Sequence, residues 1–257
     1  MQLTKEVGSI APFLIPFMKM SCVYFVLWLP EDEPCISAAF VKALPILSLI
    51  WFVCLQGISG DPSHSYNRKI LFGLVFSCCG DISLIWQNVD DSYFILGLAC
   101  FLIAHIFYTL AFEFTPFGLK EFLVLSTLAV TLFSIVLPML SGPILYAVLV
   151  YGLLLWLMSW RSLARFSLKG NIPWRKIFAA CGAILFVVSD SVLAVNKFVM
   201  PLPWERQVSM TTYYAAQLCL SLSVINSRSS TASVGSHDGY KTRNASFVNG
   251  YTTEQTK

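Results

Sequence analysis

Long apolar runs alternate with short polar segments along most of this chain. Each run is about 20 residues long, the length of α-helix that crosses the hydrocarbon core of a bilayer. We count eight such runs, at residues 10–29, 36–56, 68–87, 92–113, 119–138, 142–160, 175–198 and 208–226. The predicted fold is therefore an all-α polytopic membrane protein with eight transmembrane helices.

The composition agrees with this class. The chain has 257 residues, of which 56% are hydrophobic and 12% are charged, and its mean hydropathy is +0.70. A soluble domain usually carries about twice that share of charged residues. From Ser227 onward the sequence is rich in Ser, Thr, Asn and Gly, which is typical of disorder. We expect an eight-helix transmembrane domain over residues 1–226 and a disordered polar cytosolic tail over residues 227–257.

The distribution of positive charge predicts the orientation in the membrane. Of the 17 Lys and Arg residues, two lie well inside predicted helices, Lys19 and Lys42. In the eight-helix topology, only Lys197 and Arg206 fall on one side of the membrane. All the others fall on the opposite side, which the positive-inside rule assigns to the cytosol together with both termini. The sequon at Asn244 would then stay unglycosylated. A net charge of +3 is too small to suggest nucleic-acid binding.

Three charged side chains interrupt the apolar runs at one expected depth. Asp81 lies in GLVFSCCGDISLIW (73–86) and Asp190 in GAILFVVSDSVLA (182–194), each about 20 Å from the cytosolic end of its helix. Lys42 enters from the opposite face and reaches the same level in a core of about 30 Å. A charge at mid-bilayer costs at least about 2.5 kcal/mol, so each should face a partner or a wet cavity.

Further polar residues are predicted near this level and complete the candidate site. They are Tyr146 and Tyr151 in run 142–160, Tyr214 and Gln217 in run 208–226, and, deeper, His105 and Tyr108 in run 92–113. Gly73, Ser77 and Asp81 share one helical face, which lets a neighbouring helix approach closely. We expect a central polar cavity that is partly open to the non-cytosolic side. The alternative for each charged residue is a structural role in holding helices together.

A weak internal repeat relates the two aspartates. Asp81 and Asp190 are 109 residues apart (190 minus 81), and each lies on a helix that is predicted to start in the cytosol. The same offset relates two further pairs, His105 with Tyr214 and Lys42 with Tyr151. This predicts a parallel 4+4 arrangement with a pseudo-two-fold axis along the membrane normal, across which the aspartates face each other.

Two aspartates that meet in a pocket of low dielectric cannot both ionise easily, so they would share one proton. An acid beside a carboxylate suits cleavage through an oxocarbenium ion, because the acid supplies a proton while the carboxylate stabilises the cation or activates water. His105 is the only histidine in a predicted helix, whereas zinc needs about three protein ligands. Phosphate-loop and dinucleotide motifs are absent too, so we expect neither a metal nor an organic cofactor.

Five stretches resemble the transmembrane protein 86 / YhhN family of lysoplasmalogenases. They are VKALPIL (41–47), GLVFSCCGDISLIWQ (73–87), YFILGLACFLIAHIFYTLAF (93–112), GAILFVVSDSVLAVNKF (182–198) and TTYYAAQLCLSLS (211–223). The resemblance extends from about residue 12 to residue 226, and the stretches are specific in order and spacing. Two shorter stretches, SCVYFVLWLP (21–30) and VNKF (195–198), resemble the vertebrate A paralogue.

The resemblance implies a multi-pass enzyme of the endoplasmic reticulum membrane. Such an enzyme hydrolyses the sn-1 vinyl ether bond of a lysoplasmalogen, a lysophospholipid drawn from the membrane. The products are a fatty aldehyde and glycerophosphoethanolamine or glycerophosphocholine. The reaction and the residues agree, because protonation of a vinyl ether gives an oxocarbenium ion that water captures.

Within this reaction, either Asp81 or Asp190 would be the general acid, and the other would stabilise the cation and orient water. Lys42 would neutralise the ionised aspartate or contact the substrate phosphate. Asn196 and Lys197, near the non-cytosolic mouth, would meet the headgroup. The hydrogen-bond donors to the ether oxygen, a glycerol hydroxyl or water would be Tyr108, His105, Tyr214 and Gln217.

Other functions compete with this one. A lysolipid transporter or scramblase would use the buried aspartates to relay protons or to open a polar path, without bond cleavage. A lipid-sensing protein would use the cavity as a ligand site. A metal-dependent amide hydrolase similar to the alkaline ceramidases is disfavoured, because the histidines are missing. The oligomeric state, including a homodimer, stays open.

Overall fold

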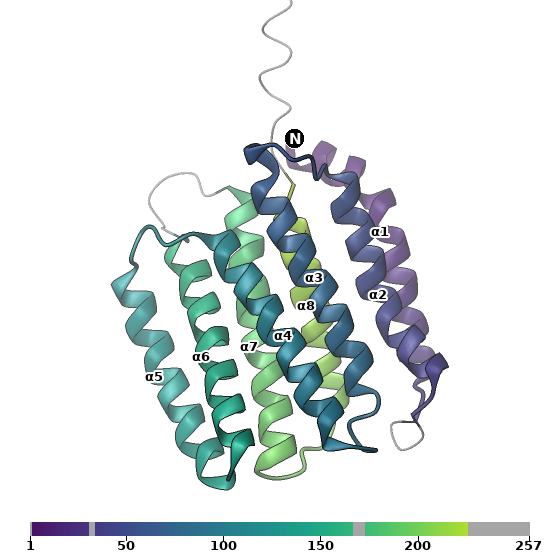
Figure 1. Cartoon of the computed structure of the whole chain (residues 1–257). Helices are drawn as coiled ribbons and strands as arrows, with labels where there is room; N and C mark the ends of the chain where they lie inside the picture. The colour runs from purple at the N-terminus through teal and green to yellow at the C-terminus, as the bar shows by residue number, and fades with distance from the viewer. Residues whose placement is uncertain (1, 31–33, 167–172, 226–257) are drawn as a thin grey trace, which may run out of the picture. The chain divides into compact units, whose positions relative to one another are not determined.

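The computed structural model describes residues 2–30, 34–166 and 173–225, and in these ranges every regular element is helical. The α-helices are α1 (Gln2–Leu27), α2 (Ile36–Leu55), α3 (Ser65–Leu84), α4 (Asp91–Phe112), α5 (Leu119–Val136), α6 (Pro143–Ala164), α7 (Trp174–Phe198) and α8 (Glu205–Leu222). Two short 3-10 helices, η1 (Pro62–His64) and η2 (Leu137–Met139), precede α3 and follow α5 (Figure 1). The tail over 227–257 lies outside the described residues.

One helix occupies each predicted apolar run, although α1 begins at Gln2, well before its run. Five stretches are long and apolar enough to cross a membrane: α2, α4, α5 together with η2, α6 and α7. The apolar part of α1, Ala11–Leu27, is shorter. α3 and α8 fall below this limit because they carry more polar residues, several of which they bury, such as Asp81 and Gln217. The described chain has the helices of a multi-pass membrane protein.

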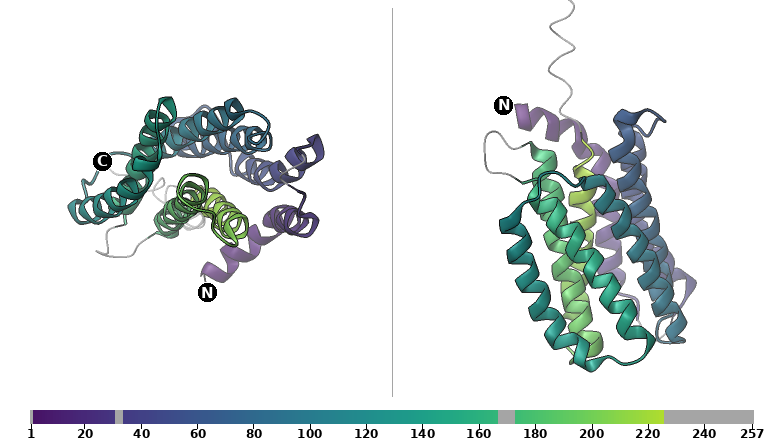
Figure 2. Two further views of the ribbon diagram at one scale, coloured as in Figure 1. Left: turned by 90° about the horizontal axis from the view of Figure 1, so that it is seen from below. Right: turned by 60° about the vertical axis from the view of Figure 1, so that its left-hand side comes forward.

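Six of the helices form a closed ring. In order of contact these are α2, α3, α4, α6, α7 and α8, and α8 packs back against α2 (Figure 2). α1 packs on α2 and α5 packs mainly on α6, so both lie outside the ring, at the two outer edges of Figure 1. Only 6% of the apolar window of α5 is buried. The ring therefore encloses the space in which a site can form.

Glycines bring the paired helices of the ring close together. A Cβ atom at Gly73 of α3 would lie 2.5 Å from Cζ of Tyr108 on α4. A Cβ atom at Gly182 of α7 would lie 3.0 Å from the carbonyl oxygen of Ala216 on α8. Small residues permit such close helix contacts in membranes. The predicted stripe of Gly73, Ser77 and Asp81 is confirmed as a buried face of α3.

A local cap fixes the start of α4. The carboxylate of Asp90 accepts hydrogen bonds from the backbone N–H of Ser92 at 2.8 Å and from its hydroxyl at 2.7 Å. These bonds satisfy a helix donor and hold the pKa of the exposed Asp90 carboxyl below its usual value. The cap therefore fixes Asp91 as the first residue of α4.

Candidate functional site

A cavity of about 260 Å³ lies inside the ring, and all six ring helices contribute to its lining. Both predicted carboxylates, Asp81 of α3 and Asp190 of α7, line this one cavity. Each lies at the same distance from the first residue of its helix, Ser65 or Trp174. The two carboxylates therefore lie at equivalent positions along their helices. The volume is near the lower end of small-molecule pockets.

Asp81 is almost fully buried, with 2% of its surface exposed. The hydroxyl of Tyr213 on α8 donates a hydrogen bond of 2.5 Å to Oδ2 of Asp81. Lys42 of α2 lines the same cavity and attracts the Asp81 carboxylate electrostatically. Within the described chain, however, no ion pair joins these two side chains. One tyrosine therefore holds Asp81 directly, while the ammonium group acts from a longer distance.

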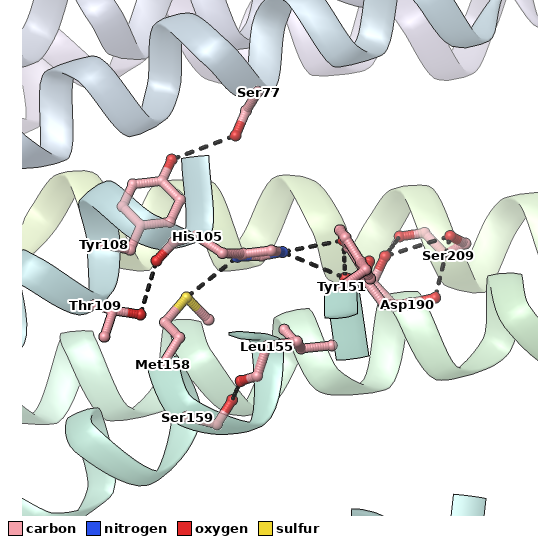
Figure 3. Close-up of polar contacts among 11 residues, drawn as sticks. Ser77, His105, Tyr108, Thr109, Tyr151, Leu155, Met158, Ser159, Asp190 and Ser209 are labelled. Atoms are coloured by element: carbon pink, nitrogen blue, oxygen red, sulfur yellow. Dashed lines mark hydrogen bonds and ion pairs between the residues drawn. The ribbon is translucent and has the colours of Figure 1, made fainter. Parts of the chain in front are cut away.

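Asp190 has a different environment. The hydroxyl of Tyr151 on α6 donates a hydrogen bond of 2.6 Å to Oδ2 of Asp190, and Nε2 of His105 lies 3.7 Å from the same oxygen. His105 Nε2 also lies 3.0 Å from the Tyr151 hydroxyl, and its Nδ1 lies 3.3 Å from the sulfur of Met158 (Figure 3). The side chain of Asp190 is 14% exposed. A chain of polar groups from His105 to Tyr151 thus leads to this carboxylate.

The two carboxylates do not contact each other directly. Among the described residues, Asp81 and Asp190 form no hydrogen bond with one another, and each accepts from its own tyrosine. A shared proton would therefore have to pass through water or substrate in the cavity. A group bound in the cavity would lie within walls that include both acids.

Three of the predicted donors lie in the core and not in the cavity wall. Tyr108, His105 and Gln217 are each fully buried and do not line the cavity. The Tyr108 hydroxyl donates a hydrogen bond of 2.8 Å to Oε1 of Gln217 and lies 3.5 Å from the hydroxyl of Ser77. These side chains therefore support the site from behind, because neighbouring protein atoms surround them.

The structure also separates the predicted tyrosines. The hydroxyl of Tyr214 donates a hydrogen bond of 3.0 Å to the carbonyl oxygen of Lys42, and Tyr214 does not line the cavity. Tyr146 is 68% exposed on α6 and also lies outside the cavity. The structure therefore does not bring these two side chains into the cavity lining, and their role in substrate binding stays a prediction. Tyr151, in contrast, is at the cavity as expected.

The cavity lining includes Asn196 and Lys197, the two residues that we expect to meet the headgroup. Asn196 accepts a hydrogen bond of 2.8 Å from the backbone N–H of Leu202. The ammonium group of Lys197 lies 4.6 Å from the ring centroid of Phe94. Several polar lining residues were not predicted, and these are Gln87, Asn88, Ser189, Glu205, Arg206, Ser209 and Tyr213. In the described part of the chain, no three His, Cys, Asp or Glu residues gather in a metal-binding group.

We expect Tyr213→Phe to lower turnover about 10- to 100-fold, because it removes the hydroxyl that holds Asp81. Hydrogen bonds to charged groups contribute about 1.5–3 kcal/mol, which corresponds to that range. Tyr214→Phe is the matched variant of the adjacent residue, which does not line the cavity and whose lost bond goes to the backbone carbonyl of Lys42 and not to a carboxylate. It should cause a much smaller loss. Initial rates of the purified variants measure the difference, and equal losses would contradict a special role for Tyr213.

Comparison with known proteins gives one family for nearly the whole bundle. The YhhN family model matches residues 37–224. The human lysoplasmalogenase TMEM86A is 41% identical over 223 residues, which cover 86% of this chain and 92% of the relative, and the Bos taurus protein of that name is also 41% identical. The human lysoplasmalogenase TMEM86B is 39% identical over 219 residues, which cover 85% of this chain and 89% of the relative.

No solved structure matches the chain significantly. The resemblance read from the five sequence stretches is confirmed, and the slightly higher identity to the A relatives agrees with the two shorter stretches. The matched residues include both cavity aspartates and all of the six ring helices except Ile36, the first residue of α2. The chain belongs to the YhhN family.

Proposed function

We propose that this chain is an integral-membrane hydrolase that cleaves the sn-1 vinyl ether bond of lysoplasmalogens. The products would be a fatty aldehyde and glycerophosphoethanolamine or glycerophosphocholine. The similarity to known proteins supports this activity, since the human relatives that match most of the chain are both named lysoplasmalogenases. The observation that carries the proposal is the pair of carboxylates, Asp81 and Asp190, in the wall of one cavity.

The cavity wall suits an amphipathic substrate. Apolar side chains on α4 and α6, among them Leu98, Phe101 and Val148, line part of the cavity and would contact the alkenyl chain. Polar side chains line the rest and would contact the glycerol and headgroup. A lipid bound in this way would bring its ether bond to the polar boundary, where the carboxylates lie.

The reaction uses one proton and one water molecule. One aspartic acid would donate its proton to the β-carbon of the vinyl ether, and the double-bond electrons would form the new C–H bond. This leaves an oxocarbenium ion that the other, ionised aspartate stabilises. Water then adds its oxygen to the α-carbon and gives a proton to that carboxylate. In the last step the second aspartate, now protonated, gives its proton to the glycerol oxygen as the C–O bond of the hemiacetal breaks. The first aspartate takes the proton of the hemiacetal hydroxyl, so the aldehyde and the glycerol alcohol leave and both carboxyl groups return to their starting states.

The same reaction assigns indirect roles to the buried groups. Tyr213 and Tyr151 would orient one carboxylate each through the hydrogen bonds described above. His105 would act on Asp190 through Tyr151, since its ring does not reach the cavity wall. Tyr108 and Gln217 would maintain the spacing of α4 and α8 behind the site. These groups act as positioning residues.

We place the enzyme in the endoplasmic reticulum membrane with eight spans and both termini in the cytosol. The polar helices α3 and α8 fit this arrangement, because ring neighbours cover much of their polar surface. The α7–α8 connection, with Lys197 and Arg206 at its ends, would then face the lumen. A glycan attached to Asn244 in the cell would contradict this orientation.

Several contacts support a parallel 4+4 repeat. Tyr108 and Gln217, which are separated by the repeat offset of 109 residues, are hydrogen-bonded to each other. Equivalent positions of two parallel repeats meet directly only at the axis that relates them. The helix packing is also symmetric under this repeat, in which α1 to α4 correspond to α5 to α8. The contact of α4 with α6 corresponds to the contact of α8 with α2, and the corresponding helices α1 and α5 both lie outside the ring.

Further pairs of contacts are equivalent under this offset. The contact between His105 and Tyr151 has its counterpart in the contact between Tyr214 and Lys42. The repeat would explain why the two aspartates lie at equal depth while their surroundings differ in chemistry.

A substrate pair tests the proposed activity. The purified chain in detergent should release aldehyde from a 1-alkenyl lysophospholipid and leave the saturated 1-alkyl analogue intact, because the alkyl ether cannot form the cation by protonation. Mass spectrometry of the products distinguishes the two results. Cleavage of both lipids would contradict the cationic mechanism. Movement of lysolipid across liposomes without any product would instead favour the transporter or scramblase.

A further inference from the structure

A second, smaller space adjoins the cavity. It has a volume of about 30 Å³ and lies toward α1 and α2, where Tyr24, Pro30 and Pro34 are among its described lining residues. The two spaces share five lining residues: Lys42, Leu84, Gln87, Asn88 and Arg206. Their boundary, which we call the junction, therefore brings two cationic side chains and two carboxamides together.

From this arrangement we propose that the junction binds the phosphodiester group of the substrate lipid, with Lys42 and Arg206 as its cationic contacts. Gln87 and Asn88 would donate hydrogen bonds from their amide groups. This inference rests on the proposed function, and it specifies where the headgroup of the lysophospholipid lies. A guanidinium group suits a phosphate because its fork of N–H donors matches two phosphate oxygens.

Aromatic contacts position Arg206 at the junction. Its guanidinium carbon lies 4.1 Å from the ring centroid of Trp28, and its Nε donates a long hydrogen bond of 3.4 Å to the hydroxyl of Tyr24. Both aromatic residues belong to α1 or directly follow it, so the outer helix fixes this side chain from one side. Stacking on a ring restrains the plane of the guanidinium group.

The spacing from the junction to the carboxylates fits the lipid. Arg206 and Tyr213 lie on the same helix about two turns apart, roughly 10 Å along the axis. In a lysophospholipid about five bonds separate the phosphorus from the sn-1 ether oxygen, a reach of roughly 6 Å. The length of the Arg206 side chain covers the remainder. A phosphate at the junction would thus leave the vinyl ether near Asp81, the hydrogen-bond partner of Tyr213.

Removing the phosphate from the substrate tests the site. With a 1-alkenyl lysophospholipid, Arg206→Gln and Lys42→Gln should each raise KM about 10-fold or more, since a hydrogen bond to a charged group contributes at least about 1.5 kcal/mol. With 1-alkenylglycerol, which has no phosphate, KM should change less than about 2-fold. Arg206→Lys should recover part of the loss and also covers the case in which Arg206→Gln fails to fold.

Arg175→Gln is the matched control. Arg175 also stacks on an aromatic ring, with its guanidinium carbon 3.8 Å from the ring centroid of Tyr66, but it lines neither space. This variant should keep the wild-type KM for both substrates. If Arg206→Gln changed KM equally for both substrates, the role of Arg206 would be purely structural and the proposal would be overturned. An unchanged KM for the lysophospholipid would also overturn the proposal.

A binding measurement separates this proposal from the proposed activity. Calorimetry with the 1-alkyl lysophospholipid and with 1-alkylglycerol needs no turnover, so it gives a result even if the wild type cleaves no vinyl ether. The wild type should bind the phosphate-bearing lipid about 10-fold more tightly, and Arg206→Gln should remove that preference. Tight binding of inorganic phosphate without any preference between the two lipids would assign the junction to free phosphate and overturn the proposal.

Discussion

Asp81→Asn and Asp190→Asn should each reduce aldehyde release by about 1,000-fold or more relative to the wild type. General acid catalysis and electrostatic stabilisation of a charged intermediate each contribute about 100- to 1,000-fold or more in enzymes. An amide has nearly the shape of the carboxyl group, yet it neither gives up a proton nor carries a negative charge. The amide oxygen can still accept the hydrogen bond from Tyr213 or Tyr151, so the fold should persist.

Asp91→Asn is the control for this pair. Asp91 is exposed in the first turn of α4, away from the cavity. Its variant should turn over the 1-alkenyl lysophospholipid at the wild-type rate. Thermal unfolding in detergent checks that all three variants are folded. Near-normal turnover in either Asp81→Asn or Asp190→Asn would eliminate the two-carboxylate mechanism.

Gly73→Ala should lower the free energy of unfolding by about 3 kcal/mol, the upper part of the usual range for overpacking. The added methyl group would overlap the ring of Tyr108, which is fully buried and hydrogen-bonded to Gln217. The ring has little room to move, because His105 and Phe186 pack around it. The α3–α4 pair would have to separate, and Asp81 would move with α3.

Two comparisons make this second prediction specific. Gly60→Ala is the control, because a Cβ atom at Gly60 has no neighbouring atom within 4 Å. It should leave the midpoint of thermal unfolding nearly unchanged. In a Tyr108→Leu background the cost of Gly73→Ala should fall by about half or more, since the ring that causes the overlap is gone. A wild-type midpoint for Gly73→Ala alone would contradict the close packing of α3 on α4.

The sequence predicted the positions of the helices well, and the depth of the two aspartates in the membrane stays a prediction. Helix positions follow from the length of the apolar runs, and depth follows from the number of residues and the rise per residue. Neither quantity depends on tertiary packing. The placement of Asp81 and Asp190 in the wall of one cavity agrees with this estimate.

The direction of side chains was harder to predict. Tyr213 and Tyr214 are neighbours at the same level, but successive residues of a helix point about 100° apart. Only Tyr213 lines the cavity, while Tyr214 binds the backbone of α2. A lipid-exposed face and a packed face are both apolar in a membrane, so the pattern does not fix how a helix is rotated. Tyr146 shows the same difficulty, because it points away from the ring.

The hydrogen bond between Tyr108 and Gln217 has a consequence for how such a bundle can be encoded. Under the 4+4 repeat proposed above, a bundle made of two identical four-helix chains would set the same residue against itself at that position. Joining the halves in one polypeptide lets a phenol face a carboxamide, so each partner can be chosen to complement the other. A single gene can thereby give the two aspartates unlike neighbours, a freedom that a homodimer of half-length subunits lacks.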